Sequence, residues 1–299
     1  MEINRESIAK RVAWISVWSN IALTLGKVIL GSYGHSDAVF ADGIHSAADV
    51  FASVIVVLVI KLANKPADED HPYGHGKAEV IVSGIVGLLL LLVSLYVVYE
   101  AVMGIFHPLE APTLLAMWVA LFSFVAKKLL YNYSMKVAKN YNSKAIEAIA
   151  FDHKADIVAS IAAALGVVLS ILGSKLHVVF LLYGDKLASI FVAYLIFNIA
   201  KELLSNSFNI LMESNIDNEL IEEFSSTISS FPEVRRIDRI RAREHGNYIL
   251  VDIRISIDYF KTIKEGHDLG RNIKDALMKE NDHIQEVLIH LNPYYPDSD

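Results

Sequence analysis

The segment Gly84-Ile-Val-Gly-Leu-Leu-Leu-Leu-Leu-Val93 is a run of ten consecutive uncharged residues, eight of which are strongly apolar. It lies inside a longer apolar stretch that exceeds the roughly 20 residues needed to cross the hydrocarbon core of a bilayer. Five more stretches of this kind occur in the chain. The six predicted transmembrane helices cover about 12–30, 38–62, 80–106, 112–133, 145–172 and 178–204. Six such stretches in succession favour an α-helical membrane domain over the long buried helices of a soluble protein.

The composition of the 299-residue chain agrees with a membrane protein. It is 54% hydrophobic and 20% charged, with a mean hydropathy of +0.39, whereas soluble domains are about 45–50% apolar and about 25% charged. Cysteine is absent, which excludes disulfides, thiolate metal ligands and thiol nucleophiles. The net charge of −7, without a basic tract, argues against nucleic acid as a partner.

Basic residues in the short connections predict the orientation in the membrane. They occur before the first predicted helix, between the second and third, and between the fourth and fifth: Arg5, Lys10, Arg11, Lys65, Lys77, Lys136, Lys139 and Lys144. Connections 31–37 and 106–111, on the opposite side, contain neither Lys nor Arg. The N-terminal segment lacks the pattern of a cleaved signal peptide. We therefore expect a multi-pass protein of the cell (inner) membrane with both termini in the cytoplasm.

The composition changes near residue 213. Residues 213–299 contain 18 acidic and 11 basic residues, whereas residues 1–212 contain 16 of each. This change predicts a transmembrane domain of residues 1–212 and a cytoplasmic domain of residues 213–299. Apolar spacing in the tail predicts a small α+β unit, a sheet covered on one face by helices. Its helix, two strands, helix and last strand are expected at about 217–228, 234–243, 249–257, 262–279 and 287–291.

Two of the predicted membrane helices carry ionisable residues at the same spacing. His45 and Asp49 lie in the second helix, and Asp152 and Asp156 lie in the fifth. Residues four apart share a helical face, and an ionisable group at membrane depth is a functional candidate because burying it there is costly. The four side chains predict one divalent-cation site with one imidazole and three carboxylates, which suits Zn²⁺, Mn²⁺ or Fe²⁺.

An alternative is that these carboxylates pair with basic residues inside the bundle or lie nearer an interface. Lys154 and His153 are the basic residues nearest in sequence to the fifth-helix pair. Small residues flank both pairs and favour the metal site, because they let helices approach closely. Asp42, three residues before His45, is then a spare ligand or a helix-packing acceptor.

The connection between the second and third predicted helices contains a further cluster, Asp68-Glu-Asp-His-Pro-Tyr-Gly-His-Gly-Lys-Ala-Glu79. His71 and His75 are four apart, acidic residues precede them, and two glycines allow a tight wrap. This density predicts a second metal site on the cytoplasmic side, with a solvated polar loop as the alternative. The tail histidines have no tight metal-binding spacing, although the fold could bring His267 and His290 together. The four are His245, His267, His283 and His290.

These motifs together resemble those of a known family. Ala41-Asp-Gly-Ile-His-Ser-Ala-Ala-Asp49, His71-Pro-Tyr-Gly-His-Gly-Lys-Ala-Glu79 and Asp152-His-Lys-Ala-Asp156 are similar to motifs of the cation diffusion facilitators. The likeness covers nearly the whole chain. It implies export of divalent metal ions against protons, a homodimer, and a tail with a metallochaperone-like, ferredoxin-like fold.

The resemblance also implies roles for particular residues. It assigns the transport site to His45, Asp49, Asp152 and Asp156, and the loop site to Asp68, His71 and His75. Lys77 and Glu213 are expected to form an interlocking charge pair, with Glu213 where the family usually has Asp.

Two departures from the zinc-transporting members bear on the metal. A tail metal site would use His267, His290 and Asp238, but Arg254 stands at a ligand position and would repel a cation. Asp152 replaces a frequent His, which tilts the membrane site toward harder ions such as Mn²⁺ or Fe²⁺.

The predicted function is proton-coupled export of divalent transition-metal cations (the Zn, Mn, Fe, Co or Cd class) by alternating access. Metal ligands must be deprotonated, so protons compete with the ion, and histidine titrates near neutral pH. The alternative is a membrane-anchored metal sensor that does not transport. A metalloenzyme is disfavoured because the chain has no HExxH motif and four protein ligands leave no position for water. The expected partners are metal ions, protons, membrane lipid and a second copy of the chain.

Overall fold

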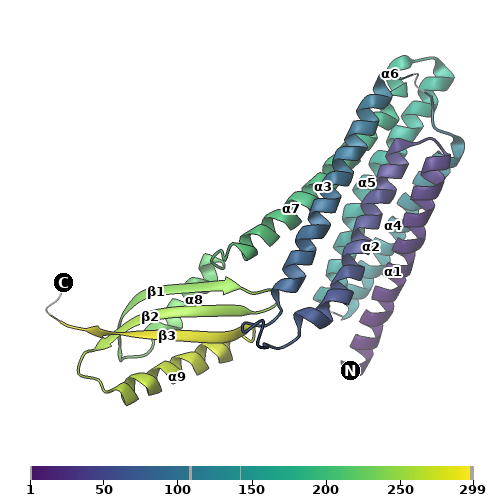
Figure 1. Cartoon of the computed structure of the whole chain (residues 1–299). Helices are drawn as coiled ribbons and strands as arrows, with labels where there is room; N and C mark the ends of the chain where they lie inside the picture. Colours follow the sequence, from purple (N-terminus) through teal and green to yellow (C-terminus); the bar gives the residue numbers. More distant parts are fainter. Residues whose placement is uncertain (1, 108–109, 142, 297–299) are drawn as a thin grey trace. The chain divides into compact units, whose positions relative to one another are not determined.

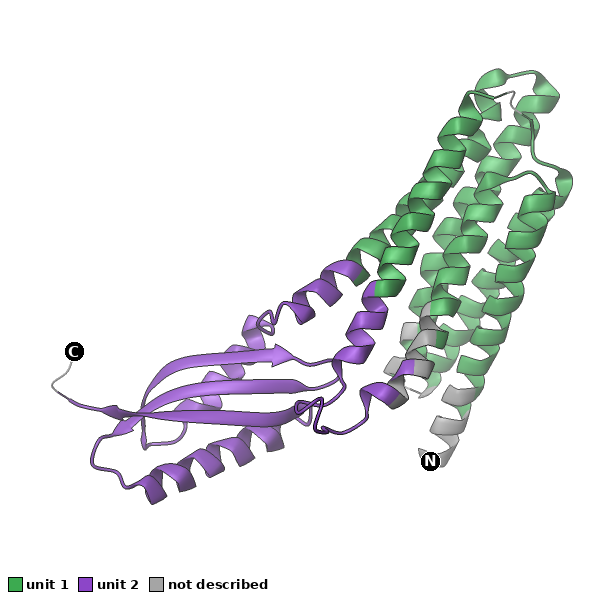
Figure 2. Ribbon diagram, viewed as in Figure 1, with its two compact units in different colours: residues 1–55, 85–203 green, residues 56–84, 204–299 purple. Residues whose placement is uncertain are grey.

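The computed structural model describes residues 2–107, 110–141 and 143–296 (Figure 1). The chain divides into two compact units (Figure 2): unit 1 contains residues 1–55 and 85–203, and unit 2 contains residues 56–84 and 204–299. The predicted domain boundary after residue 212 falls inside unit 2, which also includes one end each of α2, α3 and α7. The outer limits of the predicted domains, residues 1 and 299, lie outside the described residues.

Long helices make up the membrane part of the chain. They are α1 (Glu2–Tyr33), α2 (Asp37–Ala63), α3 (Lys77–Ile105), α4 (Leu114–Tyr141), α5 (Lys144–Leu176), the short α6 (Val179–Leu182) and α7 (Gly184–Leu211). Each predicted apolar stretch coincides with a helix, but the sixth is divided between α6 and α7. Several helices extend beyond the apolar stretch, as α4 and α7 do, because backbone hydrogen bonding continues into the polar ends.

Five helical segments within the described residues are long and apolar enough to cross a membrane. They are Arg11–Tyr33, Lys77–Ile105, Leu114–Asn140, Ile149–Leu176 and Val179–Leu211. The remaining predicted span is α2, which has 27 residues. The helical membrane domain is thus confirmed, and the sixth span stays a prediction.

The surface of the unit 1 bundle is apolar and its interior is lined by small residues. Large apolar side chains such as Trp18, Leu92, Phe122 and Leu165 are exposed. Buried positions hold many alanines, among them Ala41, Ala120, Ala159 and Ala163. Lipid tails solvate the exposed side chains, while small residues allow the close helix approach on which membrane packing depends.

The tail in unit 2 has the predicted order of elements. It consists of α8 (Asn218–Ser229), β1 (Val234–Glu244), β2 (Ile249–Asp258), α9 (Ile263–Glu280) and β3 (Ile284–Tyr294). The sheet order is β1-β2-β3, with β1 antiparallel and β3 parallel to β2. The predicted α+β tail is therefore confirmed.

The core of the tail follows from the alternation in β2. Every second residue of this strand points to one face, where residues of α8 and α9 cover it. The set comprises Val251, Ile253, Ile255 and Ile257 from the strand, Phe224 and Ile228 from α8, and Leu269, Ile273 and Leu277 from α9. The predicted last strand, 287–291, was too short, because β3 continues through Pro293 to Tyr294. An edge strand tolerates proline, since one side of it carries no ladder.

Candidate metal-ion sites

Three of the four predicted membrane ligands converge inside unit 1. One ligand atom from each of His45 and Asp49 on α2 and Asp156 on α5 lies within 4.8 Å of the other two. We call these three residues the membrane cluster. His45 and Asp156 are buried, and neither His45 Nδ1 nor Asp156 Oδ1 has a hydrogen-bond partner in the described part of the chain. Buried polar atoms without a partner are costly, and a cation bound by them would relieve that cost.

Asp152, the fourth predicted ligand, is not part of the membrane cluster. Its side chain is exposed, although it lies one turn before Asp156 on α5. Residues four apart are offset by about 6 Å along a helix and by about 40° around it. His45 and Asp49 on α2 have the same offset and both reach the group, so the difference lies in how α5 is turned about its axis: Asp156 points into the group and Asp152 does not.

Asp156 also forms an ion pair that the sequence analysis missed. The ammonium of Lys127, on α4, contacts Asp156 Oδ2 and donates to Asn20 Oδ1 at 2.8 Å. The Lys127 side chain is 0% exposed and that of Asp156 is 3% exposed. The alternative interpretation, that these carboxylates pair with basic residues, therefore describes Asp156, but through Lys127 rather than Lys154 or His153.

A second buried lysine was also missed. Lys27 on α1 pairs with Asp42 on α2, with Nζ and Oδ2 2.8 Å apart. Its ammonium also donates to Ser46 and Ser160. Asp42 is thus a helix-packing acceptor. Both lysines had a sequence signal, because a basic residue inside an apolar helix is as costly to bury as an acidic one and is a functional candidate for the same reason.

His153, next to Asp152, serves the packing of the bundle. It is buried, and its Nε2 lies 3.1 Å from Ser16 Oγ on α1.

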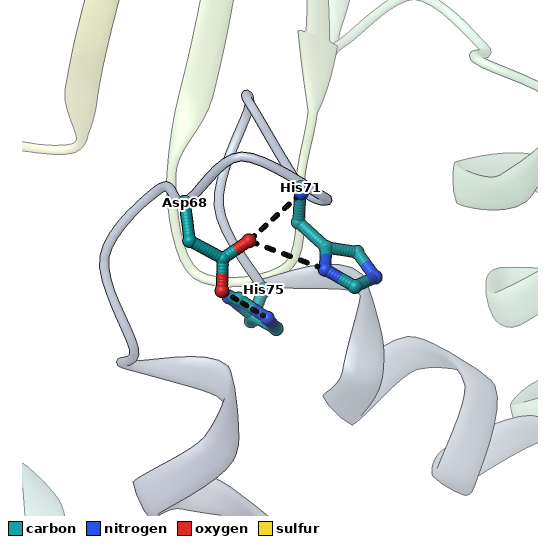
Figure 3. A group of neighbouring side chains, drawn as sticks. All are labelled: Asp68, His71 and His75. Atoms are coloured by element: carbon teal, nitrogen blue, oxygen red, sulfur yellow. Dashed lines mark hydrogen bonds and ion pairs between the residues drawn. The ribbon is translucent and has the colours of Figure 1, made fainter.

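The predicted loop ligands form a group in unit 2 (Figure 3). Ligand atoms of Asp68, His71 and His75 lie within 4.8 Å of one another. Asp68 Oδ1 accepts a 2.8 Å hydrogen bond from the His71 backbone and lies 3.4 Å from His71 Nδ1, while Oδ2 lies 3.5 Å from His75 Nε2. A hydrogen bond from Lys65, followed by that from the His71 backbone, lowers the pKa of Asp68. One ionised carboxylate beside two imidazoles is a donor set that suits Zn²⁺ or a similar ion.

The loop that carries this group packs against the β1–β2 turn of the tail, also within unit 2. The Tyr248 hydroxyl donates to the Tyr73 carbonyl, and Asn247 donates to Asn64 at 2.9 Å. Gly246, with φ of 80°, lies against the backbone of Gly76. A side chain on either glycine would collide with the other segment.

The expected charge pair is present beside this contact. Lys77, at the start of α3, contacts Glu213, whose other oxygen lies 2.6 Å from Arg243 on β1. Burial tends to raise the pKa of Glu213, but the hydrogen bond and charge of Lys77 and the charge of Arg243 outweigh it and lower the pKa. Glu213 has φ of 59°, a conformation that side-chain-bearing residues rarely adopt.

The three predicted tail ligands do not converge within the described chain. The Asp238 carboxylate accepts hydrogen bonds from Arg236, Ser256 and Asn292. His267 lies 3.3 Å from Arg271 on α9. Leu291 packs against Gly266 of α9, so its neighbour His290 points to the opposite face of the sheet. His267 and His290 cannot share an ion within one chain.

A charged cavity of about 420 Å³ lies at the end of the bundle where α1 ends and α2 begins. Its ionisable lining residues are His35, Asp37, Glu100, His107, Glu110 and Lys186. Lys186 pairs with Asp37, and the buried Asp185 accepts hydrogen bonds from Ser36 Oγ at 2.5 Å and from the Asp37 backbone at 2.8 Å. Among the described residues these side chains do not form a three-ligand group. We call this cavity the vestibule.

Comparison with known proteins identifies the family. The model of the cation efflux transmembrane domain matches residues 13–212, and that of the cation efflux protein cytoplasmic domain matches residues 216–294. The chain belongs to the cation efflux family, the cation diffusion facilitators. It is therefore a multi-pass membrane transporter with a cytoplasmic C-terminal domain, its substrates are metal ions, and it is neither an enzyme nor a sensor without transport.

Relatives align with this family member along nearly their full length. The manganese efflux system protein MneP of Bacillus subtilis is 52% identical over 295 residues, 99% of each chain. The magnetosome protein MamB of Paramagnetospirillum magneticum is 33% identical and covers 97% of this chain and 96% of its own. The metal-bound C-terminal domain of the Thermotoga maritima CzcD transporter is 27% identical and covers 25% of this chain and 87% of its own, with a TM-score of 0.25.

Proposed function

We propose that this transporter exports divalent transition-metal cations, with Mn²⁺ as the main cargo, from the cytoplasm across the cell membrane in exchange for protons. MneP, 52% identical, and MneS, 32% identical, are both named as manganese efflux proteins of B. subtilis. The donor set is consistent with that cargo, because carboxylates with one imidazole suit Mn²⁺ and the chain has no thiolate to favour softer ions.

The observation that carries the proposal is the membrane cluster. His45, Asp49 and Asp156 bring one nitrogen and two carboxylates from two helices to within 4.8 Å inside the bundle of a transporter. Asp152 is the proposed fourth ligand. A rotation of α5, or a change of its side-chain rotamer, would move it toward the ion.

The proposed coupling to protons follows from the chemistry of the ligands. A metal ion binds the deprotonated carboxylates and neutral imidazole, so protons at the outer face compete for the same atoms and release the ion. The bundle then alternates between two openings around a fixed site. The vestibule lined by Glu100 and His107 is the proposed exit, because its acidic groups attract both cations and protons.

We propose supporting roles for the other parts of the chain. Asp68, His71 and His75 form a cytoplasmic metal site, and the Lys77–Glu213 pair links the loop to the tail. The transport domain is residues 1–212 and the tail is residues 213–299. The family model that matches the tail is named ZT_dimer, which supports a homodimer. The basic residues in the connections support a cytoplasmic position for both termini. A tail metal site that includes both His267 and His290 would then draw ligands from two chains.

The test is transport by the purified protein in sealed liposomes with an imposed pH gradient. Dyes quenched by Mn²⁺ and sensitive to internal pH report both ions at once. Wild-type protein is expected to move Mn²⁺ inward as protons leave. Asp49→Asn is expected to reduce both fluxes to the level of protein-free liposomes, whereas Asp70→Asn, on an exposed loop residue, keeps the wild-type rate. Wild-type flux through Asp49→Asn would refute the site, and Mn²⁺ flux without proton flux would refute the coupling.

A further inference from the structure

Lys127 places a basic side chain directly on a candidate ligand. Its side chain is fully buried and its ammonium pairs with Asp156, a member of the membrane cluster. The next residue on α4, Lys128, is exposed, and its ammonium lies 5.6 Å from the centroid of the Tyr131 ring, so only Lys127 of this lysine pair points into the bundle. A buried charge at this depth is costly and is a functional candidate by default.

Lys27 shows that this bundle can hold a buried lysine whose partners lie outside the membrane cluster. Its ammonium is satisfied by Asp42, Ser46 and Ser160, none of which belongs to the membrane cluster. The ammonium of Lys127, in contrast, contacts the cluster residue Asp156 and also donates to Asn20 Oδ1 at 2.8 Å.

The two oxygens of Asp156 differ in their surroundings. Oδ2 contacts the ammonium of Lys127, whereas Oδ1 is buried without a hydrogen-bond partner in the described chain. An ion bound through Oδ1 would lie a few ångströms from the ammonium, and like charges at that distance in a poorly screened interior repel strongly. A cargo ion must therefore bind against this repulsion or displace the ammonium toward Asn20.

We propose that Lys127 is a tethered cation that competes with the cargo ion for Asp156, and so limits the affinity of the membrane site and promotes release. The inference rests on the proposed transport site. The ammonium replaces the cargo on Asp156 when the ion leaves, so the carboxylate is not left uncompensated. A divalent ion displaces the ammonium because it carries twice the charge. A monovalent ion has no such advantage, so Lys127 also discriminates against Na⁺ and K⁺.

The experiment measures Mn²⁺ binding to the purified full-length protein by the loss of the free-Mn²⁺ electron paramagnetic resonance signal. All variants carry His71→Ala and His75→Ala, so that the loop group does not contribute. Lys127→Met is expected to bind Mn²⁺ about tenfold more tightly or better, because a nearby like charge is removed. It is also expected to show a lower maximal transport rate and to become sensitive to competing Na⁺. Lys127→Arg keeps the charge and stays near the wild-type affinity.

The matched control replaces the other buried pair, with Lys27→Met and Asp42→Asn together. Lys27 pairs with Asp42 rather than with a member of the membrane cluster. The double substitution removes two opposite charges that both act on His45, so affinity is expected to stay within about twofold of wild type. A purely structural role for Lys127 makes the opposite prediction, since loosening the cluster weakens binding. Unchanged or weaker Mn²⁺ binding by folded Lys127→Met would overturn the inference.

If Lys127→Met does not fold, the Mn²⁺ affinity of Asn20→Leu tests the inference instead. Without its second partner the ammonium stays on Asp156, so the inference predicts weaker Mn²⁺ binding, and an unchanged affinity would overturn it. Failure of the proposed function would give a different result. If the membrane cluster does not bind the cargo, the protein that carries only His71→Ala and His75→Ala would bind Mn²⁺ equally well with and without Asp49→Asn.

Discussion

Lys27 on α1 and Asp42 on α2 form a buried ion pair, with Nζ and Oδ2 2.8 Å apart and both side chains 1% exposed. Ser160 on α5 donates to the same carboxylate oxygen at 2.9 Å and accepts from the ammonium at 3.2 Å. One charge pair thereby connects three helices. Single and paired substitutions at this site should have very different effects.

Removing only the lysine should strongly destabilise the folded protein. Lys27→Met leaves the Asp42 carboxylate buried without its counter-charge, and breaking one partner of a buried pair costs about 3–5 kcal/mol. Lys27→Met with Asp42→Asn removes both charges and should recover most of that loss. Thermal unfolding of the protein in detergent measures the difference. Equal melting temperatures for the single and double variants would show that the pair is not desolvated.

The contact between the loop and the tail depends on glycine. Gly246→Ala should destabilise the protein by about 1–2 kcal/mol, because φ of 80° disfavours a side chain. The new methyl group would also push against the Gly76 backbone. Gly270→Ala is the matched control, because a Cβ at that position in α9 meets nothing within 4 Å. It should stabilise by about 0.5–1 kcal/mol. Chemical denaturation of the full-length protein compares the two variants, and an unchanged stability of Gly246→Ala would contradict the close approach.

The Glu213 network should stabilise the protein in a defined pH range. Its pKa is lowered from 4.5, so its contribution is present above that value and is lost as the pH falls through the lower folded-state pKa. Glu213→Gln should therefore lower the melting temperature by the same amount at about pH 7 and about pH 5. In more acidic buffer the difference in melting temperature between wild type and variant should shrink. Because the side chain is 45% exposed, screening limits each pair to about 1 kcal/mol or less. Glu286→Gln, an exposed carboxylate on β3, should change little at any pH.

The loop group should bind its own ion. Equilibrium dialysis against Zn²⁺ or Mn²⁺ should show that His71→Ala with His75→Ala loses one ion per chain, because two of three ligands are removed. Asp49→Asn should lose the ion of the membrane cluster instead, so a variant that combines all three substitutions should lose two ions per chain. His283→Ala, an exposed tail histidine, should leave the count unchanged. An unchanged count in the loop variant would reduce the group to a solvated polar loop.

Much of the fold could be predicted because it depends on local patterns. Long apolar stretches located the membrane helices, and the alternation of Val251, Ile253, Ile255 and Ile257 located the central strand and its buried face. The ends of elements were less accurate. A proline normally ends a strand, but Pro293 lies on an edge strand, and that position depends on the sheet order.

The candidate sites show the same division between local and distant information. Spacing of four located His45, Asp49 and Asp156, but it did not show that Asp152 lies outside their group, because that depends on the rotation of α5. The buried lysines were missed for a related reason. Lys127 pairs with a residue 29 positions away on another helix, and sequence alone does not say which helices are neighbours.

The most direct test of the account is whether Mn²⁺ in the membrane is bound by one imidazole, that of His45. Pulsed electron paramagnetic resonance detects the magnetic coupling of a directly bound ¹⁴N to Mn²⁺, and His71→Ala with His75→Ala removes the loop histidines from the measurement. In that background we predict one imidazole nitrogen coupling, which disappears when His45→Asn is added. A bound Mn²⁺ whose spectrum has no nitrogen coupling, or retains it in His45→Asn, would contradict the proposed site.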